Sequence, residues 1–180
     1  MSLQADPGPM SAPMEGPRAA ALLLALAAAA TVGGALFIEH VMGVKPCDLC
    51  LTQRIPYYAG VPLALAVAWL GGAASRRRLA IAGLVLLGVL FAAGAGLGAY
   101  HAGVEWGWWP GPSGCTGAIA KPAGMGDFLR QLETVRVVRC DEVAIRILGL
   151  SLAAWNAVIS AAMAVFAVAC AVAAGRRVQA

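Results

Sequence analysis

Charged residues are scarce in this chain of 180 residues: Asp, Glu, Lys and Arg make up 12% of it, and aromatic residues make up 7%. A soluble domain carries about 25% charged residues, so a soluble fold with so few could not cover its own surface. Hydrophobic residues make up 61%, and this excludes intrinsic disorder, because disordered chains are poor in apolar side chains. The mean hydropathy of +0.78 therefore favours a membrane protein.

Long stretches of the chain contain no Asp, Glu, Lys or Arg, at residues 19–38, 55–75, 79–102 and 147–175. Each stretch is long enough to cross the roughly 30 Å hydrocarbon core as a helix, which takes about 20 apolar residues. The in-and-out alternation of a transmembrane barrel is absent. We therefore predict an all-α integral membrane domain over residues 19–176, a bundle of four transmembrane helices. The predicted spans are 19–38, 47–75, 79–102 and 147–174.

The segments outside the spans differ in length and character. Residues 1–18 form a tail rich in Pro, Gly, Ser and Met, for which we expect disorder. Residues 39–54 form a short link, and residues 103–146 form a long loop. The tryptophans that follow the third span are expected to anchor it in the membrane interface: Trp106, Trp108 and Trp109. Apolar residues at helical spacing in the long loop predict a short amphipathic helix: Phe128, Leu129, Leu132 and Val135.

Basic residues indicate how the chain is oriented. Three consecutive arginines, at residues 76–78, fill the tight turn between the second and third spans, and dense positive charge marks the cytoplasmic side. We therefore place this turn and both termini in the cytoplasm, and the loops 39–54 and 103–146 on the outer side. The formal net charge of +4 reflects this topology and does not indicate a nucleic-acid partner.

Four of the five cysteines fall in the two outward loops. Cys47 and Cys50 form the motif Cys-Asp-Leu-Cys, and Cys115 and Cys140 lie in the long loop. The fifth, Cys170, lies inside the last span, where we expect a buried apolar residue. Disulfides form and persist outside the cytoplasm. The four outward cysteines are therefore either structural bridges or an electron path.

The residues around Cys47 and Cys50 favour the electron path. Pro46 is suited to the first position of a helix, which would put Cys47 in its first turn and Cys50 one turn later on the same face. A helix N-terminus stabilises a thiolate. Arg54, four residues after Cys50, would place a positive charge beside that sulfur, unless the helix breaks at Pro56. A Cys-x-x-Cys bridge closes too short a loop to be an effective staple.

Other interpretations of the cysteines were weighed against this one. A zinc site usually shows two close ligand pairs, whereas Cys115 and Cys140 are far apart and neither histidine is spaced as a partner, so no metal site is expected. A c-type haem needs His directly after Cys-x-x-Cys, where Leu51 stands. The alternative function that stays open is a non-enzymatic membrane scaffold or assembly protein with two structural disulfides.

Residues 39–54 read Glu-His-Val-Met-Gly-Val-Lys-Pro-Cys-Asp-Leu-Cys-Leu-Thr-Gln-Arg. This segment resembles the first periplasmic segment of the DsbB family, disulfide bond formation protein B. The resemblance extends to the four spans, the basic turn, the separated loop cysteines and the run Leu-Gly-Leu-Ser at residues 148–151. In quinone-linked oxidases of the VKOR type the loop pair precedes Cys-x-x-Cys, whereas here it follows.

The resemblance implies a quinone-linked thiol oxidase of the bacterial inner membrane. Such an enzyme reoxidises a periplasmic thioredoxin-fold dithiol oxidase of the DsbA type and passes the electrons to ubiquinone or menaquinone. The Trp-rich segment 105–115 departs from the best-known members, which leaves open a dedicated partner, as in the DsbI-like branch.

The resemblance also implies roles for individual residues. Cys115 and Cys140 are the loop disulfide that accepts electrons from the partner, with Cys115 the site of the mixed disulfide. Cys47 and Cys50 are the pair at the membrane edge, with Cys50 nearest the quinone. Two further positions match residues that the family associates with quinone: Arg54 and His101. Asn156, a polar residue in the last span, serves either an interhelical hydrogen bond or a site near the quinone.

Overall fold

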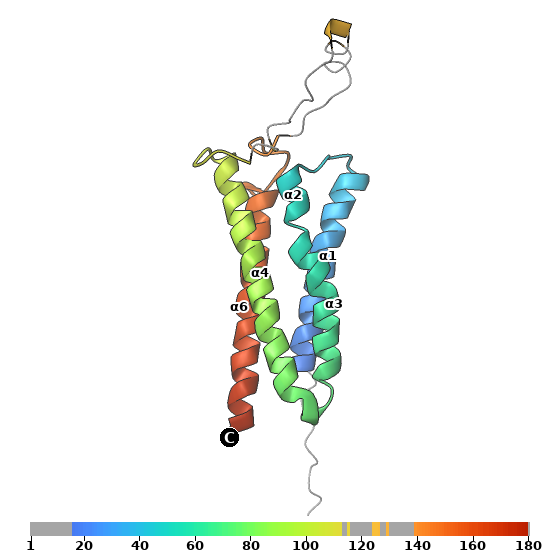
Figure 1. Ribbon diagram of the computed structural model, residues 1–180, viewed down its shortest axis with the longest axis vertical. Helices are drawn as coiled ribbons and strands as arrows, with labels where there is room; N and C mark the ends of the chain where they lie inside the picture. Colours follow the sequence, from blue (N-terminus) through green and yellow to red (C-terminus); the bar gives the residue numbers. More distant parts are fainter. Residues whose placement is uncertain (1–15, 113–114, 116–123, 127–128, 130–138, 180) are drawn as a thin grey trace, which may run out of the picture.

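The computed structural model describes residues 16–112, 115, 124–126, 129 and 139–179 of the chain. Its long helices lie side by side as a bundle (Figure 1): α1 (Pro17–His40), α3 (Ile55–Leu70), α4 (Arg77–Glu105) and α6 (Leu152–Gln179). Short elements connect them: α2 (Asp48–Thr52), the 3-10 helix η1 (Ala74–Arg76), and the antiparallel pair of β1 (Arg146–Ile147) and β2 (Leu150–Ser151). The start of α1 and the end of α6 lie at the same end of the bundle.

Small residues set the distance between α4 and α6. A Cβ atom added to Gly98 would lie 2.7 Å from the backbone nitrogen of Ala157, and one added to Gly88 would lie 2.8 Å from the side chain of Val168. Glycine at these positions therefore lets the two backbones approach closely, as is usual for helices in lipid. Tyr57 on α3 packs beside these helices in the main apolar core.

Within the described part of the chain, three helical segments are long and apolar enough to cross a membrane: Pro17–His40, Ala74–Glu105 and Leu152–Arg177. The predicted second span, 47–75, is divided in the structure, because α2 ends at Thr52 and α3 begins at Ile55. Pro56 explains the break, since proline has no N–H to donate to the carbonyl of Thr52 and its ring would clash with that carbonyl. Alone, α3 has 16 residues and measures about 24 Å at 1.5 Å per residue.

The last helix starts later than the predicted span, which began at residue 147. The segment before Leu152 forms the β1–β2 hairpin instead. Its turn contains Leu148 with φ 51° and Gly149 with φ 84°, and such left-handed conformations cannot continue a right-handed helix. The hairpin lies at the end of the bundle that also carries α2 (Figure 1).

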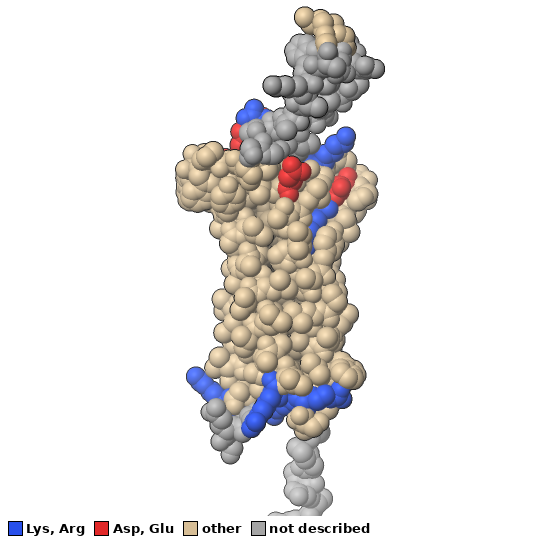
Figure 2. All heavy atoms as spheres, viewed as in Figure 1, with Lys and Arg blue, Asp and Glu red and all other residues tan. Residues whose placement is uncertain are grey.

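Charged side chains gather at the two ends of the molecule. On the face drawn in Figure 2, basic residues lie across one end, acidic and basic residues mix at the other, and the band between them carries no charge. Arg76 at the basic end stacks over Trp69, with 4.1 Å between its guanidinium carbon and the ring centroid. This distribution is typical of a helical bundle whose middle lies in hydrocarbon.

Two predictions for the outward loops have different outcomes. The amphipathic helix predicted around residues 128–136 lies outside the described residues except for Leu129, as does the tail up to residue 15. Trp106, Trp108 and Trp109 are described, and all three are exposed just beyond α4, where they pack edge to face. Their role as an interfacial anchor stays a prediction.

Candidate active site

Cys47 and Cys50 lie at the end of the bundle, on the short helix α2. Cys47 is the N-cap residue of this helix, and its sulfur accepts a hydrogen bond from the backbone N–H of Cys50 at 3.3 Å. The expectation that Pro46 begins the helix is therefore wrong, because the capping position falls at Cys47 and the helix starts at Asp48. The two cysteines are free thiols whose sulfur atoms are 2.8 Å apart.

Cys115 and Cys140 form a disulfide that links residues 25 positions apart in the chain. Both are almost fully buried, and the backbone N–H of Cys140 donates to the carbonyl of Cys115. The disulfide belongs to one apolar cluster with Cys47, against which Cys50 packs; the other members are Leu49 and Val104. The fold therefore brings the two cysteine pairs together, although they lie in separate loops.

His101, in the last turns of α4, lies between the two pairs. Its Nε2 atom is 3.7 Å from the sulfur of Cys47 and 3.2 Å from the carbonyl oxygen of Cys140. The side chain is 2% exposed. The spacing in the chain gave no reason to pair this histidine with the Cys-x-x-Cys motif, yet its ring nitrogen and the sulfurs of Cys47 and Cys50 all lie within 4.8 Å of one another.

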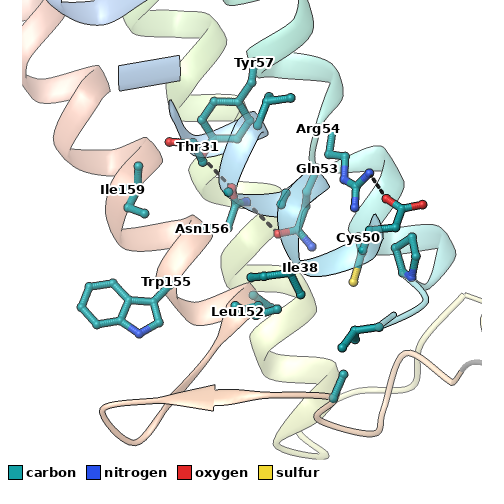
Figure 3. A pocket seen from close by; sticks show the side chains of 18 of the residues that line it. Thr31, Ile38, Cys50, Gln53, Arg54, Tyr57, Leu152, Trp155, Asn156 and Ile159 are labelled. Atoms are coloured by element: carbon teal, nitrogen blue, oxygen red, sulfur yellow. Dashed lines mark hydrogen bonds and ion pairs between the residues drawn. The ribbon is translucent and has the colours of Figure 1, made fainter. Parts of the chain in front are cut away.

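A chain of polar side chains leads from His101 into the bundle. Gln53 Nε2 lies 2.6 Å from His101 Nδ1, and Asn156 Nδ2 donates to Gln53 Oε1 at 2.7 Å. Tyr57 donates to Asn156 Oδ1 at 2.6 Å, and its hydroxyl is 2.6 Å from that of Ser160. Asn156 thus makes interhelical hydrogen bonds, and its place beside Gln53 and Tyr57 is visible in Figure 3.

Sequence reasoning did not identify three residues of this hydrogen-bond network: Gln53, Tyr57 and Ser160. A signal existed for Ser160, because it follows Asn156 by four residues on α6 and residues four apart share one helix face. Gln53 and Tyr57 are also four apart, but the break between α2 and α3 separates them, so the same argument does not apply to that pair. The signal is weak without knowledge of which helices are neighbours.

Arg54 forms an ion pair with Glu39 at the end of α1, with 2.5 Å between Nη1 and Oε2. The i,i+4 argument that placed Arg54 beside the Cys50 sulfur does not apply, because Arg54 is not part of α2 and instead caps α3. The arginine side chain is 11% exposed. Its charge is therefore held near the cysteines by a partner from another helix.

A cavity of about 390 Å³, called here the inner pocket, opens beside this ion pair. Cys50, Arg54 and His101 all line it, together with Gln53 and Asn156 at the same end. The rest of its wall is mostly apolar and comes from α1 and α6, including Ile38, Leu152 and Ile159 (Figure 3).

A second cavity of about 360 Å³, the outer pocket, lies on the other side of the cysteines. Cys50 and His101 line both cavities, whereas Cys47 lines only the outer pocket and Arg54 only the inner one. The outer pocket also has charged groups in its wall: Lys45, Glu105, Arg139 and Glu142. Cys50 and His101 therefore lie between a more polar cavity and a mostly apolar cavity.

The two thiols of the pair differ in acidity. A hydrogen bond from the Cys50 thiol, together with one from His101, lowers the pKa of Cys47. The pKa of Cys50 is raised, because its proton is held by the Cys47 sulfur and because the thiol is buried. The negative charge of the reduced pair therefore resides on Cys47 and the remaining proton on Cys50, and the thiolate is the nucleophile in disulfide exchange.

Comparison with known proteins agrees with this geometry. The profile of the family Disulfide bond formation protein DsbB matches residues 17–170. This chain belongs to the DsbB family. The match includes all four cysteines of the two pairs, as well as α1, α3, α4 and most of α6. No solved structure gives a significant match.

Individual relatives carry the same description. A disulfide bond formation protein B of Polaromonas sp. is 31% identical over 151 residues, which cover 78% of this chain and 82% of the relative. One of Xanthomonas axonopodis pv. citri is 33% identical over 160 residues, or 83% and 87% of the two chains. Disulfide bond formation protein B 1 of Pseudomonas aeruginosa is 51% identical over 43 residues, or 24% and 26%. The protein is thus a membrane protein of disulfide bond formation, with a disulfide-forming oxidoreductase role.

Proposed function

We propose that this DsbB-family protein is a quinone-dependent thiol oxidase of the bacterial inner membrane. It reoxidises a periplasmic thioredoxin-fold dithiol oxidase of the DsbA type and passes the electrons to ubiquinone or menaquinone. The observation that carries the proposal is the shared position of Cys50: it packs against the cluster that holds the loop disulfide, and it lines an apolar cavity that reaches toward the lipid-facing helices.

The proposed exchange begins at the loop disulfide. A thiolate of the partner attacks the sulfur of Cys115, which forms a mixed disulfide and releases the other loop sulfur as a thiolate. The second thiolate of the partner displaces Cys115 from the mixed disulfide, so the partner leaves oxidised and both loop sulfurs are reduced. One loop thiolate then attacks the Cys47–Cys50 disulfide, forms a disulfide between the two pairs and releases the other sulfur of that pair as a thiolate. The second loop thiolate displaces this bond, which restores the loop disulfide and leaves Cys47 and Cys50 reduced. Cys47, Cys115 and Cys140 belong to one buried cluster, which supports direct transfer between the two pairs.

The inner pocket fits a quinone. Its volume of about 390 Å³ falls in the usual range of roughly 300–1,000 Å³ for small-molecule sites, which combine apolar walls with a few polar groups. Arg54, Gln53 and Asn156 offer hydrogen-bond donors at one end, next to Cys50. A quinone bound there supplies a two-electron, two-proton acceptor. Arg54 would orient its ring, and the arginine charge would stabilise negative charge that develops beside Cys50. His101 would line the site with its ring, because both of its nitrogens contact protein groups.

Redox energetics require such an acceptor. The reference potential of DsbA is about −120 mV, whereas structural protein disulfides lie below about −300 mV, and 30 mV corresponds to about 1.4 kcal/mol for two electrons. A disulfide at −300 mV would therefore oxidise such a partner uphill by about 8 kcal/mol. A cysteine relay that ended in the protein would not turn over.

The topology follows from the same proposal. We place α3 as a fourth span that α2 extends, because residues 48–70 would measure about 34 Å as a helix. Four spans return the chain to the side where it started, which agrees with the common end of α1 and α6 in Figure 1. The arginines at that end are then cytoplasmic by the positive-inside rule, and both cysteine pairs face the periplasm.

The test is an oxidase assay with purified protein in lipid nanodiscs. A reduced DsbA-type protein and ubiquinone or menaquinone are added, and quinone reduction is followed by absorbance while partner thiols are counted. We expect one quinone consumed per partner dithiol, and loss of turnover in Cys50→Ser and Cys115→Ser. If the wild-type protein consumes no quinone, or if its two disulfides survive a mild dithiol unchanged, the protein is a disulfide-stapled scaffold.

A further inference from the structure

The hydrogen of the His101 ring can be assigned to one nitrogen. The carbonyl oxygen of Cys140 lies 3.2 Å from Nε2, and a carbonyl only accepts hydrogen bonds, so Nε2 is the donor. The same N–H faces the sulfur of Cys47 at 3.7 Å. In a neutral ring the other nitrogen, Nδ1, then carries only a lone pair and must accept.

Gln53 provides the donor that Nδ1 requires. Asn156 Nδ2 donates to Gln53 Oε1, which leaves Gln53 Nε2 to donate to His101 Nδ1 at 2.6 Å. Tyr57 uses its only hydrogen for Asn156 Oδ1, so at its other contact it accepts from Ser160. Every hydrogen bond of the chain therefore runs in one direction, from Ser160 on α6 to His101 on α4.

Because these side chains are buried, reversing the direction of one hydrogen bond alone is unfavourable. Gln53 is 5% exposed and Ser160 is fully buried. Turning the amide of Gln53 alone would set two N–H groups against each other at Asn156, and each unsatisfied buried group costs about 1–3 kcal/mol. The direction of these hydrogen bonds is therefore set by all the residues of the network together.

We propose that Gln53 and Asn156 are positioning residues that hold His101 in the tautomer with hydrogen on Nε2, so that one N–H contacts both cysteine pairs. The purpose of this contact rests on the proposed function: the N–H stabilises charge on the Cys47 sulfur and fixes the Cys140 backbone beside it. The two pairs are thereby kept in position for exchange. The tautomer itself is a property of the resting protein and can be measured without turnover.

The direct test is ¹⁵N NMR of the protein labelled only at histidine. The chain has 2 histidines, and they should be opposite tautomers, because His40 uses Nδ1 toward the carbonyl of Leu36 at 3.0 Å. The sample has the Cys47–Cys50 pair oxidised, so that no thiolate faces the His101 ring. At about pH 8.5, where an ordinary imidazole is neutral, we expect hydrogen on Nε2 of His101 and on Nδ1 of His40. Hydrogen on Nδ1 of His101 in the wild-type protein would overturn the inference, whatever the variants show.

Two variants test whether the hydrogen-bond chain is the cause. Asn156→Asp can only accept, so Gln53 turns its N–H groups toward the new carboxylate and its oxygen toward His101, whose Nδ1 should gain a hydrogen. The double variant Gln53→Met/Asn156→Asp keeps the added charge but interrupts the chain, and Nδ1 should stay without hydrogen. An unchanged His101 spectrum in the single variant, or an equal change in both variants, contradicts the proposal.

The same labelled samples are assayed for quinone-dependent thiol oxidation, which separates the two proposals. Hydrogen on Nε2 in a protein that consumes no quinone would refute the proposed function and leave the positioning role of Gln53 and Asn156 intact. An active oxidase with hydrogen on Nδ1 would refute the positioning role alone.

Discussion

The Cys47 thiolate predicts an unusual pH profile for alkylation. An ordinary thiol with a pKa of about 8.5 is about 24% ionised at pH 8 and about 0.3% ionised at pH 6, so its reaction with iodoacetamide slows about 80-fold. The hydrogen bonds from Cys50 and His101 lower the pKa of Cys47. At the resulting pKa of about 4, about 99% of Cys47 stays ionised at pH 6.

The assay is a short iodoacetamide pulse on protein with Cys47 and Cys50 reduced, with the Cys47 peptide quantified by mass spectrometry. Cys47 lines the outer pocket, which gives the reagent a route to the sulfur. We expect less than a twofold decrease in rate between pH 8 and pH 6, because thiolate is lost only as the pH falls through the lowered pKa. Cys50→Ala removes the main donor and should restore a steep decrease. An 80-fold decrease in the wild-type protein would refute the assignment of the charge to Cys47.

Further substitutions test other parts of the account. Arg54→Met should raise the apparent KM for quinone while both disulfides still form, and unchanged quinone kinetics would exclude Arg54 from the quinone site. Gly98→Ala should destabilise the α4–α6 packing by about 1–3 kcal/mol. Its control is Gly96→Ala, which should be neutral or stabilising by up to about 1 kcal/mol, because an added Cβ meets nothing within 4 Å there. Equal thermal stabilities of the two variants in detergent would contradict this. Cys170→Ala should leave turnover intact at normal protein levels, since Cys170 packs half-buried against the apolar core.

Composition was sufficient to predict the helical bundle, because the absence of charge over long stretches directly reflects burial in lipid. Local backbone chemistry then shifted the boundaries. Pro56 divides the second predicted span, and the left-handed residues Leu148 and Gly149 delay the last helix to Leu152. Pro56 is visible in the sequence as a possible helix break, whereas the left-handed conformation of Leu148 is seen only in the structure.

The site was predictable to the extent that its residues form motifs. The pairing of Cys115 with Cys140 followed from the family resemblance and is present in the structure. The contact of His101 with Cys47 and Cys140 was not predictable, because it joins residues from three separate segments. The Arg54–Glu39 pair likewise required knowledge of how α1 lies beside α3. Helix neighbours and their rotation are tertiary information that hydrophobic periodicity does not contain in a lipid-facing bundle.

The central claim is that electrons pass from the loop disulfide through Cys47 and Cys50 to a quinone, and a single-turnover experiment tests it most directly. Fully oxidised protein without quinone is mixed with one equivalent of reduced partner, the thiols are trapped at timed intervals, and ubiquinone is then added. Before the addition, the account predicts that most of the partner stays reduced and that Cys47 and Cys50 stay oxidised, because the transfer is uphill without an acceptor. Within one turnover after the addition, it predicts oxidised partner, reduced quinone and a restored Cys47–Cys50 disulfide. A partner that is fully oxidised without quinone, or that stays reduced after quinone is added, would contradict the account.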